Sequence, residues 1–252
     1  MAAPDSGQYV NFVELCDKTR RQCGIAGANV PGTLTPATTQ DQTGEMLRIV
    51  EWVRQAYREI CAAKNSWTFL RSDFSVNTVA SQEAYLPTAC TDENLNALIG
   101  SLAVGNFARW EVDSFRIYLQ SDGVASRQFL WWIGYDWFRN LYDLRPMTPM
   151  RPVRFTIRPN DRAIMLGPIP DNVYIVEGKY WRQAPDLEQD TDVPLFPPRF
   201  HDAIVYLAAR YYAGYQEDGG AYSDFNTKYE QFYGRLLLDQ LPMIETPAPL
   251  VG

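Results

Sequence analysis

The strongest helix signal in the chain is the stretch VPLFPPRFHDAIVYLAARYYAGY, which runs from Val193 to Tyr215. It opens with Pro194, Pro197 and Pro198, and proline suits the first turn of a helix because its missing N–H is not needed there. Apolar residues then recur at three- and four-residue spacing, which places them on one face of a helix. These residues are Phe200, Ala203, Ile204, Leu207, Ala208 and Tyr211. The pattern predicts a helix that begins at the prolines.

A second, unusually aromatic helix is predicted to follow, from about residue 222 to residue 238. Gly214 and the pair Gly219-Gly220 are expected to end the first helix. The stripe of the second helix consists of Tyr222, Phe225, Tyr229, Phe232, Tyr233 and Leu236. Packing against the first helix accounts for part of this face. The remaining aromatic side chains favour an interface with another subunit or partner, because tyrosine combines an apolar ring with a polar tip.

Two more helices are predicted near the N-terminus. The first begins at Asn11, where Glu14 three positions later completes a capping box. The second covers about 44–64 and is apolar on more than one side, so it is expected to pack against two neighbours. The residues between them, 25–42, are rich in Gly, Pro and Thr and form a long loop.

The middle of the chain, from about residue 67, has the alternation and the β-favouring residues of strands. Short helices are expected within 91–106 and at 135–144. Strands are expected at 68–79, 84–86, 114–119, 128–133 (buried), 153–157, 163–166 and 173–181, with a hairpin turn at 159–161. The sequence therefore predicts an α+β fold, in which a helical bundle from both ends of the chain holds a large β-rich insertion. The expected domains are a helical domain of 1–66 and 193–240, a β-rich insertion of 67–192, and an extended C-terminal tail of 241–252.

Two further groups of residues are candidates for contacts with other proteins. Four arginines lie on or beside the predicted hairpin and could form bidentate pairs with carboxylates of a partner; they are Arg151, Arg154, Arg158 and Arg162. The tail contains three prolines, which stop a helix and leave the segment extended. Its apolar residues are Leu241, Met243, Ile244, Leu250 and Val251. Solvated strand faces, and a tail folded back on its own helices, are the alternatives for these two groups.

The bulk composition is that of a globular protein able to build a core. The chain has 252 residues, 46% of them hydrophobic, and a formal net charge of −7. That charge argues against a broad nucleic-acid surface, which needs clustered Lys and Arg, but it allows a passage through which DNA slides. No apolar run approaches the roughly 20 residues of a membrane span. The N-terminus, MAAPDSGQ, lacks the features of a signal peptide, so we expect a protein made and used without secretion.

No catalytic, cofactor or metal motif is apparent in the sequence. The four cysteines are widely spaced without a CxxC pair, which disfavours zinc. His201 is the only imidazole and is expected to be structural, because catalysis by histidine needs a positioned partner. Hydrolysis by a pair of carboxylates stays open as an alternative, as does a sugar-binding groove. The acidic and aromatic residues in question are Asp161, Asp171, Asp186, Glu188, Asp190 and Asp192, and Trp131, Trp132, Trp137 and Trp181.

In the order of its elements and in several short stretches of sequence, the chain resembles the head-to-tail adaptor (connector) proteins of tailed bacteriophages. That group includes the tail accessory factors and the tail tubular A proteins of short-tailed phages. The resemblance covers nearly all of the chain. It is carried by GEMLRIVEWVRQAYREI at 44–60, NSWTFLR at 65–71, DSFRIYL at 113–119, RPVRFTIRPNDRAIMLGPIP at 151–170 and PPRFHDAIVYLAARYYA at 197–213.

The resemblance implies a structural virion protein rather than an enzyme. Such adaptors form a ring, usually of twelve copies, below the portal protein, extend the DNA channel, and provide the docking platform for the next tail or nozzle protein. By this likeness the protein is made in the host bacterial cytoplasm, needs no cofactor and lies in the virion neck, where its C-terminal tail attaches to the portal. The large insertion departs from small, mainly helical adaptors. Another neck or tail subunit, such as a tail terminator or a nozzle protein, is the first alternative.

Overall fold

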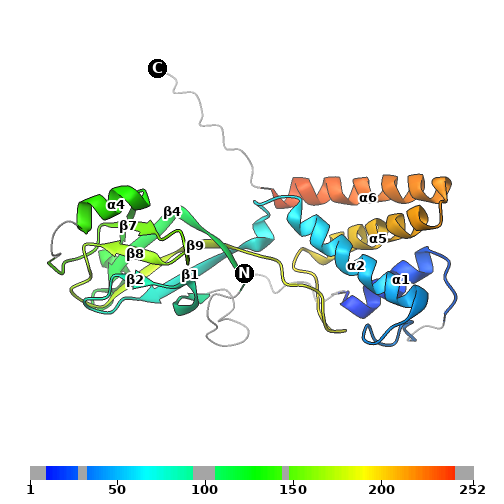
Figure 1. Ribbon diagram of the computed structural model, residues 1–252, viewed down its shortest axis with the longest axis horizontal. Coiled ribbons are helices and arrows are strands. Elements are labelled where there is room, and N and C mark those ends of the chain that lie inside the picture. Colours follow the sequence, from blue (N-terminus) through cyan, green and yellow to red (C-terminus); the bar gives the residue numbers. More distant parts are fainter. Residues whose placement is uncertain (1–9, 28–32, 93–105, 144–147, 242–252) are drawn as a thin grey trace, which may run out of the picture. The chain divides into compact units, whose positions relative to one another are not determined.

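The structure is a computed structural model that describes residues 10–27, 33–92, 106–143 and 148–241 (Figure 1). The chain divides into two compact units. A helical unit comprises residues 1–69 and 184–252, and a β unit comprises residues 70–183. The α+β class expected from the sequence is confirmed.

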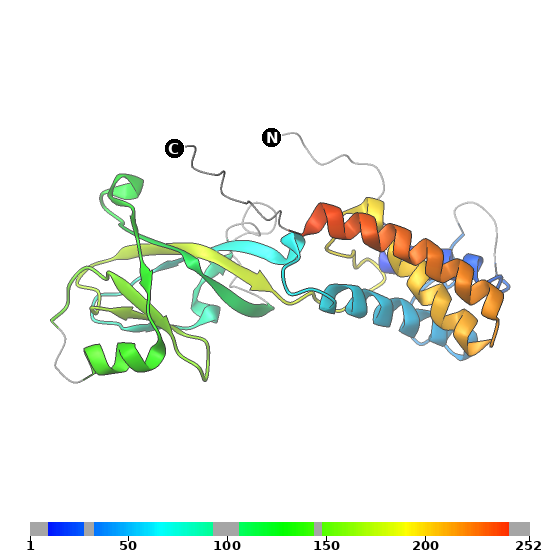
Figure 2. The same ribbon diagram turned by 90° about the horizontal axis from the view of Figure 1, so that it is seen from above.

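The helical unit is built around α5 (Asp202–Tyr215), which packs against α1 (Phe12–Gln22), α2 (Gly44–Ala62) and α6 (Gly219–Gln240). Small residues allow this helix to have three neighbours, because alanines let other backbones approach closely on several sides. The buried residues of α5 are Ala203, Ile204, Val205, Leu207, Ala208, Ala209 and Ala213. Both ribbon views show α6 alongside α5 (Figures 1 and 2).

The start of α1 is as expected, whereas the turn between α5 and α6 is not. The Glu14 amide donates to the Asn11 side chain at 2.9 Å and the Asn11 amide donates to Glu14 at 3.0 Å, which completes the capping box. The prolines form the 3₁₀ turn Pro198–Phe200 that precedes α5. The expectation that the glycines end this helix was wrong.

Instead, α5 runs through Gly214 to Tyr215, and α6 begins at Gly219, earlier than predicted. A helix tolerates an interior glycine at a cost of about 1 kcal/mol. The chain reverses at Glu217, whose φ of 57° is left-handed, and the Asp218 side chain then caps α6 by accepting from the Ala221 amide at 3.0 Å. The polar residues of this turn, rather than the glycines, set the boundary.

Two non-helical segments of the helical unit, 33–42 and 184–192, are held by hydrogen bonds to each other and to the helices. The Phe12 and Val13 amides donate to the carbonyls of Asp192 and Asp190. Asp190 also accepts from the amide and the hydroxyl of Thr39 at 2.6 and 2.5 Å, and Asp186 forms a two-armed ion pair with Arg58. The acidic segment 184–192 is thus held in place by its own carboxylates.

The β unit contains two sheets. The five-stranded sheet has the order β3-β1-β9-β4-β5 and the four-stranded sheet has the order β2-β8-β7-β6; the pairing is antiparallel except between β6 and β7. The first sheet consists of β1 (Arg71–Asn77), β3 (Thr91–Asp92), β4 (Phe107–Leu119), β5 (Gln128–Phe129) and β9 (Tyr174–Arg182). The second consists of β2 (Ala84–Tyr85), β6 (Trp131–Trp132), β7 (Arg154–Ile157) and β8 (Ile164–Gly167).

The core of the β unit contains side chains from both sheets. Phe115 of β4 and Phe155 of β7 stack with ring centroids 4.1 Å apart, and Phe74 of β1 meets Phe115 at 5.1 Å. The short helix α4 (Tyr135–Tyr142) lies beside β7 (Figure 1). The hairpin expected at 153–166 is confirmed as the antiparallel pair β7–β8.

Two expectations for the β unit need correction, and a third lies outside the described residues. Residues 128–133 do not form one buried strand: β5 and β6 belong to different sheets, and between them only Leu130 is buried. Both short strands are at sheet edges, and their aromatic residues Phe129, Trp131 and Trp132 are 60%, 68% and 51% exposed. The strand expected at 114–119 extends back to Phe107, with a register break between Glu111 and Arg116. Most of the excursion 91–106, including any helix there, falls in 93–105, outside the described residues.

Candidate interaction surfaces

The aromatic stripe of α6 is only half covered within the helical unit. Among the residues of α6 only Leu236 is buried, and Tyr222 is 45% exposed. Tyr229 and Tyr233 stack with centroids 5.4 Å apart, and Tyr233 meets Trp67 edge-on at 6.2 Å. Arg210 lies over the Tyr229 ring at 5.1 Å, and burial is the main cause that raises the pKa of Tyr229 to about 12. The stripe therefore presents neutral aromatic rings with polar tips at the surface of the unit.

The tail candidates are described only at their first residue. Leu241 follows α6 as its C-cap and donates its amide to the Leu237 carbonyl at 3.1 Å. Met243, Ile244, Leu250 and Val251 lie outside the described residues. The adjoining Leu238 is 85% exposed, so an apolar side chain of the last helical turn lies on the surface of the helical unit.

The four candidate arginines have different environments. Arg151 is half-buried and donates to the Ser126 carbonyl at 2.6 Å. Arg158 pairs with Asp161 through two hydrogen bonds of 2.9 and 2.6 Å, and this pairing lowers the pKa of Asp161. Arg154 is exposed on β7, and Arg162 is exposed with a left-handed φ of 61°. These side chains do not converge on one place; only Arg162 lines a pocket of the β unit described below.

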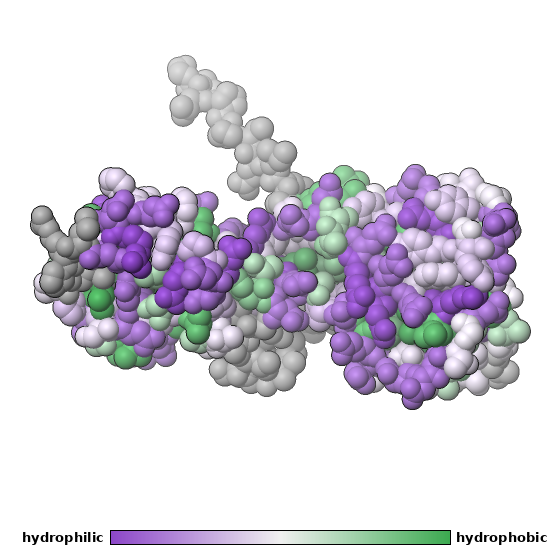
Figure 3. All heavy atoms as spheres, viewed as in Figure 1, coloured by the Kyte–Doolittle hydropathy of each residue, from purple (hydrophilic) through white to green (hydrophobic). Residues whose placement is uncertain are grey.

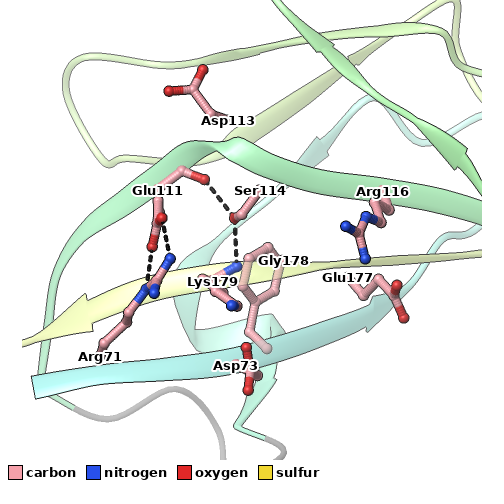
Figure 4. A pocket seen from close by; sticks show the side chains of 10 residues that line it. Arg71, Asp73, Glu111, Asp113, Ser114, Arg116, Glu177, Gly178 and Lys179 are labelled. Atoms are coloured by element: carbon pink, nitrogen blue, oxygen red, sulfur yellow. Dashed lines mark hydrogen bonds and ion pairs between the residues drawn. The ribbon is translucent and has the colours of Figure 1, made fainter. Parts of the chain in front are cut away.

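A charged hollow of about 380 Å³ lies over the register break of β4 (Figure 4). The Ser114 hydroxyl donates to the Glu111 carbonyl at 2.6 Å and accepts from the Lys179 amide at 2.7 Å, so it bridges the gap in the ladder. Arg71 forms a two-armed ion pair with Glu111. Figure 4 shows Asp113 pointing away from this pair.

Two of the four carboxylates that line this hollow are paired with arginines. Glu111 pairs with Arg71, and Glu177 pairs with Arg127 at 2.9 Å, while Asp73 and Asp113 also line the hollow. A glycosidase needs one carboxyl group that delivers a proton and another with room for water or sugar. The guanidinium-paired Glu111 and Glu177 offer neither, so these two residues fit a fixed electrostatic surface better than a hydrolytic site.

A second pocket of the β unit, of about 340 Å³, is mainly aromatic. Residues of β4, β6 and β7, the N-terminal end of α4, and the β7–β8 turn line it. They are Phe107, Arg109, Trp110, Val112, Trp132, Tyr135, Thr156, Ile157, Pro159 and Arg162. The sequence placed Trp132 in a buried strand and in a candidate sugar-binding groove, and Arg162 among four candidate arginines. The other tryptophans of that groove, Trp131, Trp137 and Trp181, do not line this pocket. Its remaining residues were not foreseen, because no local pattern indicates that five separate segments converge.

Comparison with known families decides the class of protein. The family model described as SU10 adaptor protein matches residues 10–250. The chain belongs to the SU10 adaptor protein family. This confirms the resemblance to phage head-to-tail adaptors, and it gives the chain a structural adaptor role in a bacteriophage. No curated protein was found to match the chain.

The family is one of structural adaptor proteins, and the environment of the one histidine fits a structural role. His201 is 1% exposed, its Nε2 lies 3.0 Å from the Phe196 carbonyl, and its ring meets Phe196 edge-on. Burial lowers the pKa of His201, so the neutral ring donates Nε2–H to this carbonyl. The histidine thereby fixes the chain just before α5.

Within the part of the chain that the structure describes, the thiols are not activated as nucleophiles and the acidic residues do not form a metal site. Burial raises the pKa of Cys23, Cys61 and Cys90 to about 12, so these thiols are poor nucleophiles at neutral pH. No group of three or more His, Cys, Asp or Glu residues is arranged to hold a metal ion among the described residues. No described helix is both long and apolar enough to cross a bilayer.

Proposed function

We propose that this adaptor forms a ring of twelve copies below the portal, extends the DNA channel and provides the docking platform for the next tail or nozzle protein. The adaptor family supports this proposal at the coarser level of a neck component. The protein would be made in the host bacterial cytoplasm and would then join the virion neck.

The observation that carries the proposal is the half-covered aromatic face of α6. This helix of 22 residues has one buried residue, and Phe225, Tyr229 and Tyr233 are only half-buried, so its packing against α5 leaves aromatic surface uncovered. In a cyclic ring each subunit must offer two different patches, one to each neighbour. Tyrosine and phenylalanine are enriched at such interfaces, because they bury a large area with few rotatable bonds. Tyr222, Phe225, Tyr229 and Tyr233 are therefore the proposed contact residues of one patch.

The surface of the helical unit has the mixed character of such an interface. On the face drawn in Figure 3, pale atoms of intermediate hydropathy and small green apolar areas lie between purple hydrophilic ones. The net charge of −7 adds a second argument, because a negative channel wall does not retain DNA phosphates. The four candidate arginines of the β unit, of which Arg154 and Arg162 are exposed and Arg151 and Arg158 half-buried, would face the tail-side partner. The C-terminal tail would contact the portal or a neighbouring adaptor.

The direct test is assembly with the portal of the same phage. Purified portal rings are titrated with the adaptor and examined by sedimentation velocity. We expect binding to saturate at one adaptor per portal subunit. A tail terminator or a nozzle subunit would not bind the portal, so failure to co-sediment at any ratio would contradict the proposal and favour those alternatives.

A further inference from the structure

The aromatic pocket of the β unit has the size and lining of a site for a peptide rather than a structural void. Its volume is about 340 Å³, within the range of about 300–1,000 Å³ that ligand pockets have. Phe107, Trp110, Trp132 and Tyr135 contribute four rings to its lining. Trp132 is 51% exposed, so the pocket opens to the surface at this residue.

The charged side chains that line the pocket are of one sign. Arg162 is exposed, Arg109 lies over the Trp181 ring at 5.1 Å, and no carboxylate is among the residues that line the pocket. Thr156 is fully buried, and its hydroxyl has no hydrogen-bond partner within the described residues. The rim therefore favours an anionic group in a ligand, and the buried hydroxyl offers one hydrogen bond to a ligand's backbone.

The edge strand β6 contributes Trp132 to the pocket, and its neighbour Trp131, 68% exposed, belongs to the opposite face of the strand because successive side chains alternate. The edge of β6 also leaves backbone groups available to an extended peptide.

We propose that this pocket binds the segment Leu241–Gly252 of a second copy of the chain, in an extended conformation. The segment reads LPMIETPAPLVG and combines three prolines with aliphatic residues and one acidic residue, Glu245. Proline-rich segments are recognised by aromatic grooves because their polyproline conformation costs little entropy to fix. Glu245 supplies the anion that Arg162 favours.

The segment is long enough to extend well beyond the end of α6. Its twelve residues span about 37 Å in a polyproline helix, at about 3.1 Å per residue. A sugar ligand is less suited to the pocket, because Thr156 and Tyr135 are the two side chains of the lining that can accept from a sugar hydroxyl, while the two arginines only donate. The inference rests on the proposed ring for its neighbouring copy in the virion, but the peptide test below does not require a ring.

The test measures binding of a fluorescent peptide of residues 241–252 to the full-length protein. The receptor carries Pro247→Ser, Pro249→Ser and Leu250→Ser, so that its own segment does not compete. We expect saturable binding that weakens about tenfold or more in receptors with Trp132→Ala or Tyr135→Ala. The matched control is Phe129→Ala, because Phe129 is a similarly exposed aromatic residue (60%) that does not line the pocket.

The charge contribution is tested by pairing two substitutions. Arg162→Gln in the receptor and Glu245→Gln in the peptide should each weaken binding. When both changes are present, the loss of affinity should be smaller than the two single losses combined. Near-UV circular dichroism of each receptor establishes that the pocket variants are folded. Absence of binding, equal binding by the folded Trp132→Ala and Tyr135→Ala receptors, or Trp132-dependent binding of maltoheptaose in place of the peptide would each overturn the proposal. Because the portal is absent from this assay, its failure leaves the ring proposal to its own test.

Discussion

Arg20 is the most deeply buried charge of the helical unit, and it holds the loop that follows α1. Its side chain is 1% exposed, and its Nε and Nη2 donate to Asp17 Oδ1 at 3.2 and 3.1 Å. The same guanidinium donates to the carbonyls of Ile25 at 2.7 Å and Thr35 at 3.2 Å. One residue therefore satisfies a buried carboxylate and two backbone carbonyls.

Arg20→Ala should lower the free energy of unfolding by about 3–5 kcal/mol, because it leaves Asp17 buried beside a single remaining cation. Arg21→Ala is the matched control: Arg21 also pairs with Asp17, at 2.6 Å, but is 47% exposed and should cost about 0–1 kcal/mol. Urea unfolding followed by far-UV circular dichroism measures both values. Equal losses for the two variants would show that burial is not the deciding factor.

His201 should make stability depend on pH in a defined direction. Its folded-state pKa lies below the unfolded value of about 6.5 because the ring is buried neutral. The folded state then binds fewer protons, so its contribution is fully present above about pH 6.5 and is lost as pH falls through that value toward the folded pKa. His201→Asn should have lower stability at pH 7 and a flatter profile between pH 7 and pH 5.5, measured by urea midpoints. The same slope in both proteins would exclude His201 as the source.

At the scale of elements, α4 depends on a glycine of β8. A Cβ atom at Gly167 would lie 2.5 Å from a ring carbon of Tyr142 and 2.8 Å from one of Phe138. Gly167→Ala should therefore cost about 1–3 kcal/mol through overpacking. Gly134→Ala is the control, because nothing lies within 4 Å of a Cβ there and its φ is −61°; it should cost less than about 1 kcal/mol. Chemical denaturation with near-UV detection compares them, and similar costs would contradict the close contact.

The proposed interface on α6 gives a prediction that separates assembly from folding. Tyr222→Ala should change the unfolding free energy by about 0.5 kcal/mol or less, since Tyr222 is 45% exposed, yet should weaken ring formation on the portal. Gln231→Ala, an exposed polar position of the same helix, should leave assembly unchanged. Analytical ultracentrifugation of portal mixtures measures the effect. A Tyr222→Ala protein that assembles like the wild type would remove this residue from the interface.

Elements with local signals were predictable from the sequence. The Asn11–Glu14 pair and the spacing of Ile204 and Leu207 involve neighbours on one helix, so the capping box and the apolar face of α5 follow from short-range chemistry. The prediction of one buried strand at 128–133 was wrong, because the apolar pattern of a segment does not reveal that the chain passes from one sheet to another or that a strand lies at an edge. The first half of β4 was missed although Arg109, Glu111 and Asp113 alternate with Trp110 and Val112 as in a strand. The alternation changes phase before Phe115, where the pairing of β4 with β9 has its register break.

The candidate face of α6 and the aromatic pocket also differ in how far the sequence could predict them. The candidate face of α6 was visible because Tyr222 to Tyr233 recur at helical spacing within one element. The aromatic pocket was not, because Trp110 of β4 and Trp132 of β6 are brought together by tertiary structure. The Nε1–H of Trp110 donates to the Arg162 carbonyl at 2.7 Å, so even the rim depends on a residue 52 positions away.

At the scale of the whole molecule, the chain combines a helical unit that begins and ends it with a β unit formed by the middle of the chain. Membership of the adaptor family gives this combination a structural role in the virion. The proposed ring uses the aromatic face of α6 for contacts with its neighbours, while the β unit offers its pocket to the C-terminal segment of a second copy and its arginines to further subunits. The net charge of −7 is compatible with passage of DNA through such a ring, since the 30 acidic residues outnumber the 23 basic ones.

The central claim, a ring of identical adaptors on the portal, is tested most directly by cryo-electron microscopy of the reconstituted portal–adaptor complex. The account predicts a continuous ring of twelve adaptor copies coaxial with the portal, with the aromatic face of α6 at every contact between neighbours. A portal that carries single, separated adaptors, or a ring whose contacts leave α6 exposed to solvent, would contradict it.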